Sequence, residues 1–168
     1  MGKRVSAEGQ NEAATQLVNS LTSIEGVTGE VLSRTNGTQT RNIAHLQCEP
    51  ASWRKVAETM KYDHAVDHCS MITGIHWPDS SEKNWEVIYH FLRTGVTDPL
   101  ITEDGSSIIP NITEPKKLSG TEVPIEIQVN IAIPETRTPS VPSIQDIWVG
   151  ADWNEKETWD LVGIDFDG

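Results

Sequence analysis

Residues 123–133 read VPIEIQVNIAI, and this segment decides the fold. Apolar residues alternate through it, with Glu126, Gln128 and Asn130 between them. A period of two predicts a β-strand with one buried side and one side that faces water. A sheet with one wet face is typically antiparallel and covered by helices on the other face. The alternating apolar residues are Val123, Ile125, Ile127, Val129, Ile131 and Ile133.

Two further segments supply the remaining predicted strands of this sheet. In residues 84–92, NWEVIYHFL, the side chains of Trp85, Val87, Tyr89 and Phe91 share one face of a predicted strand. Residues 27–34 (VTGEVLSR) and 38–48 (TQTRNIAHLQC) flank Asn36-Gly37, and Asn-Gly is a strong signal for a β-hairpin.

Helices are predicted before and after this hairpin. Ala13, Leu17, Val18 and Leu21 recur at helical spacing within residues 10–24. Residues 49–61, EPASWRKVAETMK, form a helix opened by a proline in its first turn. The order of elements predicts an α+β fold: a mostly antiparallel sheet with helices packed on one face, and a helical motif at the C-terminus.

We interpret residues 1–168 as one domain, because this length suffices for a core without disulfides. Residues 95–122 are rich in Gly, Pro, Ser and Thr, which predicts a surface excursion from the domain.

The charge and the apolar content exclude several classes of partner. The net charge of −12 argues against nucleic acid and against an anionic membrane surface. No apolar run approaches the roughly 20 residues that span a bilayer. The N-terminal MGKRVSAEGQ lacks the apolar stretch of a signal peptide, and Cys48 and Cys69 are too few for a disulfide framework. We therefore expect an intracellular protein.

Residues 63–69, DHAVDHC, are the strongest candidate for a metal site, with His64, His68 and Cys69 close in sequence. A shared ion requires a helix, which would place His64 and His68 on one face. The β-branched residues that follow predict a strand over 68–77 instead, with His68 and Cys69 on opposite faces. The predicted rows are Cys69, Met71, Thr73 and Ile75 on one side, with Cys69 in the core, and His68, Ile72 and His76 on the other.

Residues 145–168, QDIWVGADWNEKETWDLVGIDFDG, carry seven acidic residues and one lysine, a net charge of −6, together with three of the six tryptophans. On one helix these aromatic and acidic side chains do not separate into two faces. One interpretation is a surface that meets a basic partner. The other is two short helices with a kink near Gly150, each with an ordinary apolar side. The pattern alone does not decide between them.

Residues 141–168 resemble the C-terminal signature of the complex I 30 kDa subunit family, whose members are the C subunits of NADH:quinone oxidoreductase. VIYHFL and DHCSMITGIHWPD also resemble two strands of the family, so the likeness covers about residues 55–168. The residues that match the signature are Pro142, Ser143, Ile144, Ile147, Trp148, Ala151, Trp153, Glu155, Glu157, Trp159, Asp160, Gly163 and Ile164.

The chain departs from the family pattern at several places. Lys156 stands where the family usually has Arg, Asp152 replaces Asn, and Val162 replaces an aromatic residue. The excursion at 95–122 is longer than the usual turn, and the family continues past the position of Gly168 with an Arg-rich tail. Relatives in deazaflavin-coenzyme dehydrogenases or membrane-bound hydrogenases are therefore a second possibility.

The resemblance implies a cofactor-free, non-catalytic subunit of the peripheral arm, on the cytoplasmic face of the membrane. Its implied partners are the large 49 kDa-type subunit near the quinone pocket and neighbouring iron–sulfur subunits, which it would hold in electron-transfer geometry. A small metal-dependent enzyme using His64, His68 and Cys69, and a free-standing interaction domain, are the alternatives from other classes. The residues that we expect to dock the partner are Trp148, Trp153, Glu155, Lys156, Glu157, Trp159, Asp160 and Gly163.

The strand predicted over residues 68–77 leads to a first test. Because it separates His68 from Cys69, purified protein should contain well under one equivalent of zinc, iron or copper by elemental analysis. A stoichiometric metal that is lost in His68→Ala would contradict this expectation.

Overall fold

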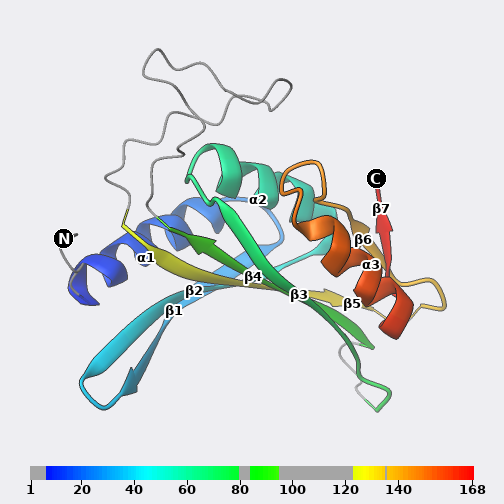
Figure 1. The fold of residues 1–168 in the computed structure, drawn as a ribbon, viewed down its shortest axis with the longest axis horizontal. Coiled ribbons are helices and arrows are strands. Elements are labelled where there is room, and N and C mark those ends of the chain that lie inside the picture. Colours follow the sequence, from blue (N-terminus) through cyan, green and yellow to red (C-terminus); the bar gives the residue numbers. More distant parts are fainter. Residues whose placement is uncertain (1–6, 80–83, 95–122, 135) are drawn as a thin grey trace.

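The computed structural model describes residues 7–79, 84–94, 123–134 and 136–168, and the excursion predicted at 95–122 lies outside this range. Figure 1 shows a sheet with helices gathered on one of its faces. The elements in chain order are α1 (Ala7–Leu21), β1 (Val27–Asn36), β2 (Gln39–Cys48), α2 (Pro50–Tyr62), β3 (His68–His76), β4 (Trp85–Arg93), β5 (Ile125–Ile133), β6 (Ser140–Pro142), α3 (Ala151–Val162) and β7 (Asp165–Asp167).

Strand β5 lies at the centre of the main sheet, whose strand order is β1-β2-β5-β4-β3. It pairs parallel with β2 and antiparallel with β4, while the other two pairings are antiparallel. Its five large apolar side chains from Ile125 to Ile133 are buried, whereas Glu126, Gln128 and Asn130 are half-buried and Ala132 is exposed. The predicted α+β fold with a mostly antiparallel sheet is confirmed.

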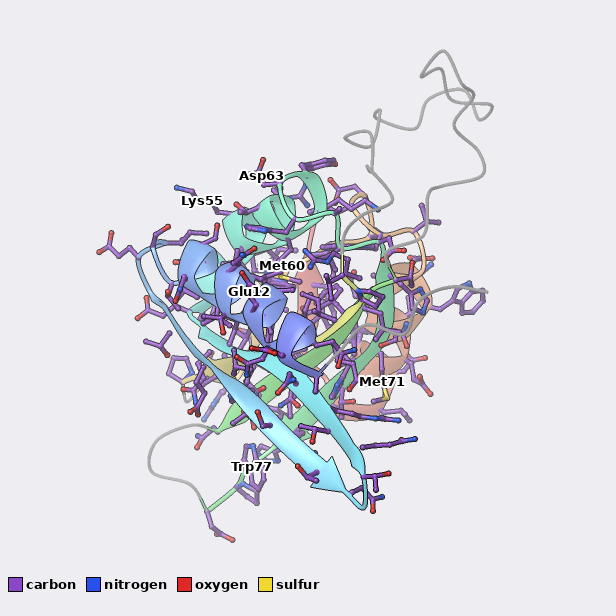
Figure 2. All side chains as sticks on the ribbon, turned by 90° about the vertical axis from the view of Figure 1, so that its left-hand side faces the viewer. Glu12, Lys55, Met60, Asp63, Met71 and Trp77 are labelled. Carbon is purple, nitrogen blue, oxygen red and sulfur yellow. The ribbon has the colours of Figure 1, made fainter. Side chains whose placement is uncertain are left out.

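The core fills the space between the helices and the apolar face of the sheet. Trp53 of α2 is fully buried, and its ring centroid lies 4.4 Å from that of Tyr89 and 6.1 Å from that of Phe91. Figure 2 shows Met60 pointing from α2 toward the sheet, while Trp77 lies beyond the far side of the sheet. Among the residues that the structure describes, the helices therefore pack on one face of the sheet only.

The hairpin forms where Asn36-Gly37 predicts it. Asn36 pairs with Gln39, so Gly37 and Thr38 are the two loop residues. Gly37 has φ of +61°. That value suits the first central position of a type II′ turn, which glycine adopts without strain and which matches the twist of the two strands.

The rows predicted for β3 are wrong beyond Ser70. Cys69 pairs with Phe91, and the register then shifts so that Met71 pairs with His90 and Ile72 with Tyr89. This β-bulge adds one residue to β3 and moves every later side chain to the other face. Cys69 and Ile72 are thus buried together, and Met71 is 47% exposed.

The same shift corrects the position of His76, which we expected on the face of His68. His76 pairs with Trp85, and their rings stack with centroids 4.0 Å apart. His68 pairs with Leu92 on the face opposite Cys69, so the predicted separation of His68 from Cys69 is confirmed.

The central position of β5 leads to a stability prediction. Ile127→Ala should lower the free energy of unfolding by about 2–5 kcal/mol, because it leaves a cavity in the core. Glu126→Ala should change it by no more than about 0.5 kcal/mol, because its ion pair with Arg41 lies at the surface. Chemical denaturation of both variants measures this, and equal losses would mean that the second sheet face is covered as well.

Candidate docking site

The C-terminal signature folds as a small unit on the edge of the sheet. Strand β6 pairs parallel with β7, and α3 connects them across β3. Residues 145–150 form turns rather than a first helix, and the helix that follows begins after Gly150. The helix ends at Gly163, which has φ of +82° and donates its N–H to the carbonyl of Trp159. Of the predicted pair of short helices, the described residues form only the second.

The inner face of α3 packs closely on β3. Ala151, Glu155 and Thr158 are its buried residues. At Gly74 of β3, a Cβ atom would come within 2.6 Å of the Thr158 methyl carbon, so only glycine allows the helix this close to the strand. This contact fixes which side of α3 faces outward.

Glu155 is a buried tie between α3 and the segment after β6. Its side chain is 5% exposed and accepts hydrogen bonds from the Ser143 hydroxyl at 2.7 Å and the Ile144 backbone N–H at 2.8 Å. Burial raises the pKa of Glu155, and these two hydrogen bonds partly oppose the shift. Glu155 therefore acts inside the chain, and its carboxylate is not on the surface that we expected to dock a partner.

Trp148 is also internal. Its indole N–H donates to the carbonyl of Val66 at 3.1 Å, and its ring centroid lies 4.7 Å from that of Phe91. The adjacent turn is held by Arg54 of α2, which forms a bidentate ion pair with Asp146 and donates to the Ser143 carbonyl at 3.1 Å. This ion pair holds the pKa of the Asp146 carboxyl below its usual value.

Arg54 is a structural residue that the sequence analysis missed, whereas Ser143 appeared there as a match to the family signature. The partners of Arg54 are Ser143 and Asp146, which lie 89 and 92 residues away in the chain, so no local pattern identifies Arg54.

The outer face of α3 is unusually apolar for a surface. Among the described residues, six large hydrophobic side chains are exposed, and four of them lie in this short segment: Val149 (83%), Trp153 (79%), Trp159 (56%) and Leu161 (77%). Exposed Glu157 and Asp160 stand among them. We use the name α3 patch for Val149, Trp153, Glu157, Trp159, Asp160 and Leu161. Several large apolar side chains exposed in one short segment are typical of an interaction surface.

Lys156 lies at the edge of the α3 patch with its charge already engaged. Its Nζ is 2.8 Å from Asp152 and 5.8 Å from the centre of the Trp153 ring. Six of the eight predicted docking residues are thus on the surface: Trp153, Lys156, Glu157, Trp159, Asp160 and Gly163. Gly163 contributes the end of the helix rather than a side chain.

The predicted metal candidates do not meet. His64 Nε2 lies 2.8 Å from the Ser20 hydroxyl, and Cys69 is buried with its thiol pKa raised to about 12 by desolvation. In the part of the chain that the structure describes, no three His, Cys, Asp or Glu side chains are placed to hold one ion. Across the same residues, no helix is both long and apolar enough to cross a membrane.

The Glu155 tie leads to a prediction about stability and pH. Glu155→Ala should lower the free energy of unfolding by about 1–3 kcal/mol, because the Ile144 N–H loses its acceptor in a buried place. Glu157→Ala, on the outer face of the same helix, should stay within about 0.5 kcal/mol.

The pH dependence follows from the raised pKa. The folded chain holds the Glu155 proton more tightly than the unfolded chain, so this group favours the fold below the ordinary value of 4.5 and loses that contribution as pH rises through the folded pKa. As the pH rises from 4.5 through the pKa of Glu155 in the folded chain, wild type should therefore lose stability relative to Glu155→Gln. Denaturation at stepped pH measures the difference, and a constant difference would contradict the assignment.

Comparison with known proteins shows which family this chain resembles. A profile described as "Respiratory-chain NADH dehydrogenase, 30 Kd subunit" matches residues 46–168. The C subunit of NADH-quinone oxidoreductase from Nocardioides sp. is 26% identical over 115 residues, which are 67% of this chain and 35% of that protein. The C subunit from Methylobacillus flagellatus is 22% identical over 156 residues, 86% of this chain and 62% of that protein. The J subunit of NAD(P)H-quinone oxidoreductase from a Synechococcus species is 44% identical over 43 residues, 26% of this chain and 22% of that protein.

A solved structure shares the fold. The trypsin-resistant fragment (1-134) of Nqo5 superimposes with a TM-score of 0.56 at 17% sequence identity, over 93% of this chain and 96% of that one. The chain spans between 22% and 62% of the length of the three curated relatives. The family profile covers well over half of the chain and includes both β5 and the whole of α3. The chain belongs to the 30 Kd subunit family of the respiratory-chain NADH dehydrogenase.

Proposed function

We propose that the chain is an accessory subunit, of the 30 kDa type, in the peripheral arm of an NADH:quinone oxidoreductase-like complex. The observation that carries the proposal is the family match over residues 46–168. In this role the chain binds no cofactor of its own. It docks on the large 49 kDa-type subunit and on neighbouring iron–sulfur subunits, and keeps them in electron-transfer geometry at the cytoplasmic face of the membrane.

The two faces of α3 support a positional role. The inner face is held by the close contact at Gly74 and by the hydrogen bonds of Glu155, so the outer face is presented in one orientation. A surface that is rigid before binding loses less conformational entropy when the complex forms. Exposed tryptophans on such a surface are the commonest anchors of protein interfaces.

The titratable groups of the chain also suit this role. Burial raises the pKa of Cys48 and of Cys69 to about 12 and holds the pKa of Tyr89 well above its ordinary value. These three side chains are buried in the core, and their raised pKa values keep them protonated at neutral pH. Their shifts reflect burial rather than the tuning of an acid or a base.

A subunit of a deazaflavin-coenzyme dehydrogenase or of a membrane-bound hydrogenase is a narrower variant of the same proposal. It would use the same α3 patch and differ in the electron donor of its neighbours. The proteins that co-purify with the chain from membranes would separate the variants. The metal-enzyme alternative gains no support, because His68 and Cys69 lie on opposite faces of β3.

The proposal predicts the effect of shortening a patch residue. Trp153→Ala should weaken assembly by about 2 kcal/mol or more, roughly thirtyfold, because an exposed aromatic anchor is lost. The free chain should unfold at the wild-type temperature, since the side chain is 79% exposed. The measurement is recovery of the membrane complex with the tagged chain, beside thermal unfolding of the isolated chain.

Met71→Ala is the matched control, because it removes an exposed apolar side chain from the opposite face of the sheet. It should leave assembly unchanged. Equal recovery of wild type, Trp153→Ala and Met71→Ala would place the interface elsewhere on the chain.

A further inference from the structure

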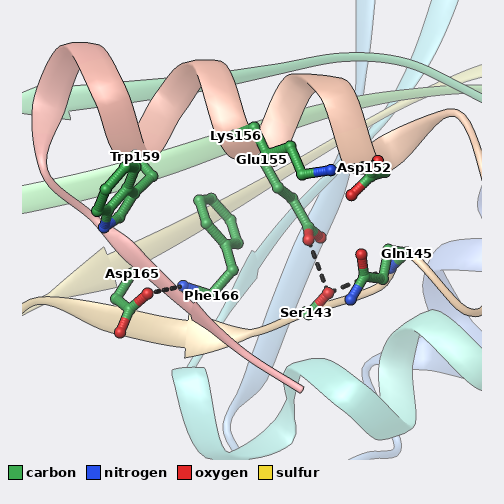
Figure 3. A pocket seen from close by; sticks show the side chains of 8 residues that line it. All are labelled: Ser143, Gln145, Asp152, Glu155, Lys156, Trp159, Asp165 and Phe166. Atoms are coloured by element: carbon green, nitrogen blue, oxygen red, sulfur yellow. Dashed lines mark hydrogen bonds and ion pairs between the residues drawn. The ribbon is translucent and has the colours of Figure 1, made fainter.

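A groove runs between α3 and β7 beside the α3 patch. Figure 3 shows it from close by, with α3 above and β7 below. Its empty volume is about 480 Å³, part of which is open solvent. The residues that line it are Ser143, Gln145, Asp152, Glu155, Lys156, Trp159, Asp165 and Phe166.

The two ends of this groove differ in charge. At one end, Lys156 turns toward Asp152 and forms an ion pair with it at 2.8 Å, so these two charges compensate each other. At the other end stands the exposed carboxylate of Asp165, whose Oδ1 accepts the Phe166 backbone N–H at 3.0 Å. No cation among the eight lining residues neutralises Asp165, because the one lysine is engaged with Asp152.

The walls at the Asp165 end are aromatic. Trp159 is 56% exposed, and Phe166 of β7 is half-buried below it. An indole face attracts a cation that stacks on it, and a carboxylate beside the ring completes the recognition. A guanidinium group meets both requirements at once, because it is flat, always charged and able to donate two parallel hydrogen bonds to one carboxylate.

The surroundings reinforce this charge preference. Residues 145–168 carry a net charge of −6. Two basic side chains of α2 lie near them: Arg54 is paired with Asp146, and Lys61 lies over the Trp148 ring with its Nζ 5.7 Å from the ring centroid. A partner surface that is acidic or neutral would leave this charge uncompensated on docking. A basic one would neutralise it and gain both affinity and association rate.

We propose that the groove between α3 and β7 receives an arginine side chain of the partner subunit, stacked on Trp159 and paired with Asp165. The inference rests on the proposed docking function and gives it a specific contact. The α3 patch supplies apolar area, while the groove supplies the charged contact that sets the orientation of the two subunits.

Site-specific photocross-linking tests this contact in the assembled complex. The photoreactive residue p-benzoylphenylalanine replaces Trp159 in the chain as it assembles in cells, and replaces Trp153 in a parallel sample. Mass spectrometry then identifies the cross-linked peptides. The expected adduct from position 159 lies at or next to an arginine of a partner subunit.

The inference would be overturned by an adduct from position 159 on a partner segment that has no arginine, whether that segment carries a lysine or no cation at all. The docking proposal would still stand. The inference is overturned in the same way if position 153 gives a partner adduct and position 159 gives none. Absence of partner adducts from both positions, in complexes that retain the chain, would overturn the docking proposal itself.

Two substitutions test the energetics in the same complex. Trp159→Leu keeps the apolar bulk and removes the indole face, and Asp165→Asn keeps the shape and removes the charge. Each should weaken retention of the chain roughly tenfold while the free chain unfolds at the wild-type temperature. Glu30→Gln, the same loss of charge on exposed β1, is the control and should retain wild-type assembly. Wild-type retention by both groove variants, while Trp153→Ala weakens assembly, would refute the arginine contact alone.

Discussion

Strand β5 is hydrogen-bonded on both edges and buried along one face, and the rest of the structure depends on this arrangement. Its parallel pairing with β2 means that the chain cannot pass from one to the other by a tight turn. The intervening segment therefore includes α2 and the β3–β4 pair, which places α2 over the apolar face and β3 at the far edge. Helix α3 then packs on that edge.

The packing of α3 on the edge strand β3 also determines which residues of α3 are exposed. Gly74 lets α3 approach β3 closely, and Glu155 uses its carboxylate on Ser143 and Ile144 rather than on a partner. Because one side of a twelve-residue helix is fully used within the chain, its tryptophans at 153 and 159 are left outside. One short signature thus contains two functions: a buried tie that orients the helix, and an exposed patch that this orientation presents.

Much of the fold could be predicted from the sequence, because the strongest patterns belong to the strands with one wet face. The alternation in 123–133 and the Asn36-Gly37 turn are local signals, and the structure places both as expected. The bulge at Ser70 could not be predicted in this way. It depends on how β3 pairs with β4, and it reverses the faces of Ile72 and His76 without any mark in their own residue types.

In the candidate site, too, the burial of individual residues could not be predicted from the sequence. Trp148 and Trp153 lie in one acidic, aromatic segment, yet the first is 4% exposed and the second 79%. Composition cannot separate them, because their burial depends on contacts with Val66 and Phe91 far away in the chain. Glu155 is likewise an acid that residue type alone would place at the surface, and its hydrogen bonds to Ser143 and Ile144 hold it inside.

The central claim is that the outer face of α3 is exposed in the free chain and covered in the complex. Hydroxyl-radical footprinting with mass spectrometry measures this directly, residue by residue, in both states. The account predicts that Trp153 and Trp159 are oxidised in the free chain and protected in the complex, with Trp148 protected in both. Equal oxidation of Trp153 and Trp159 in the two states would contradict it.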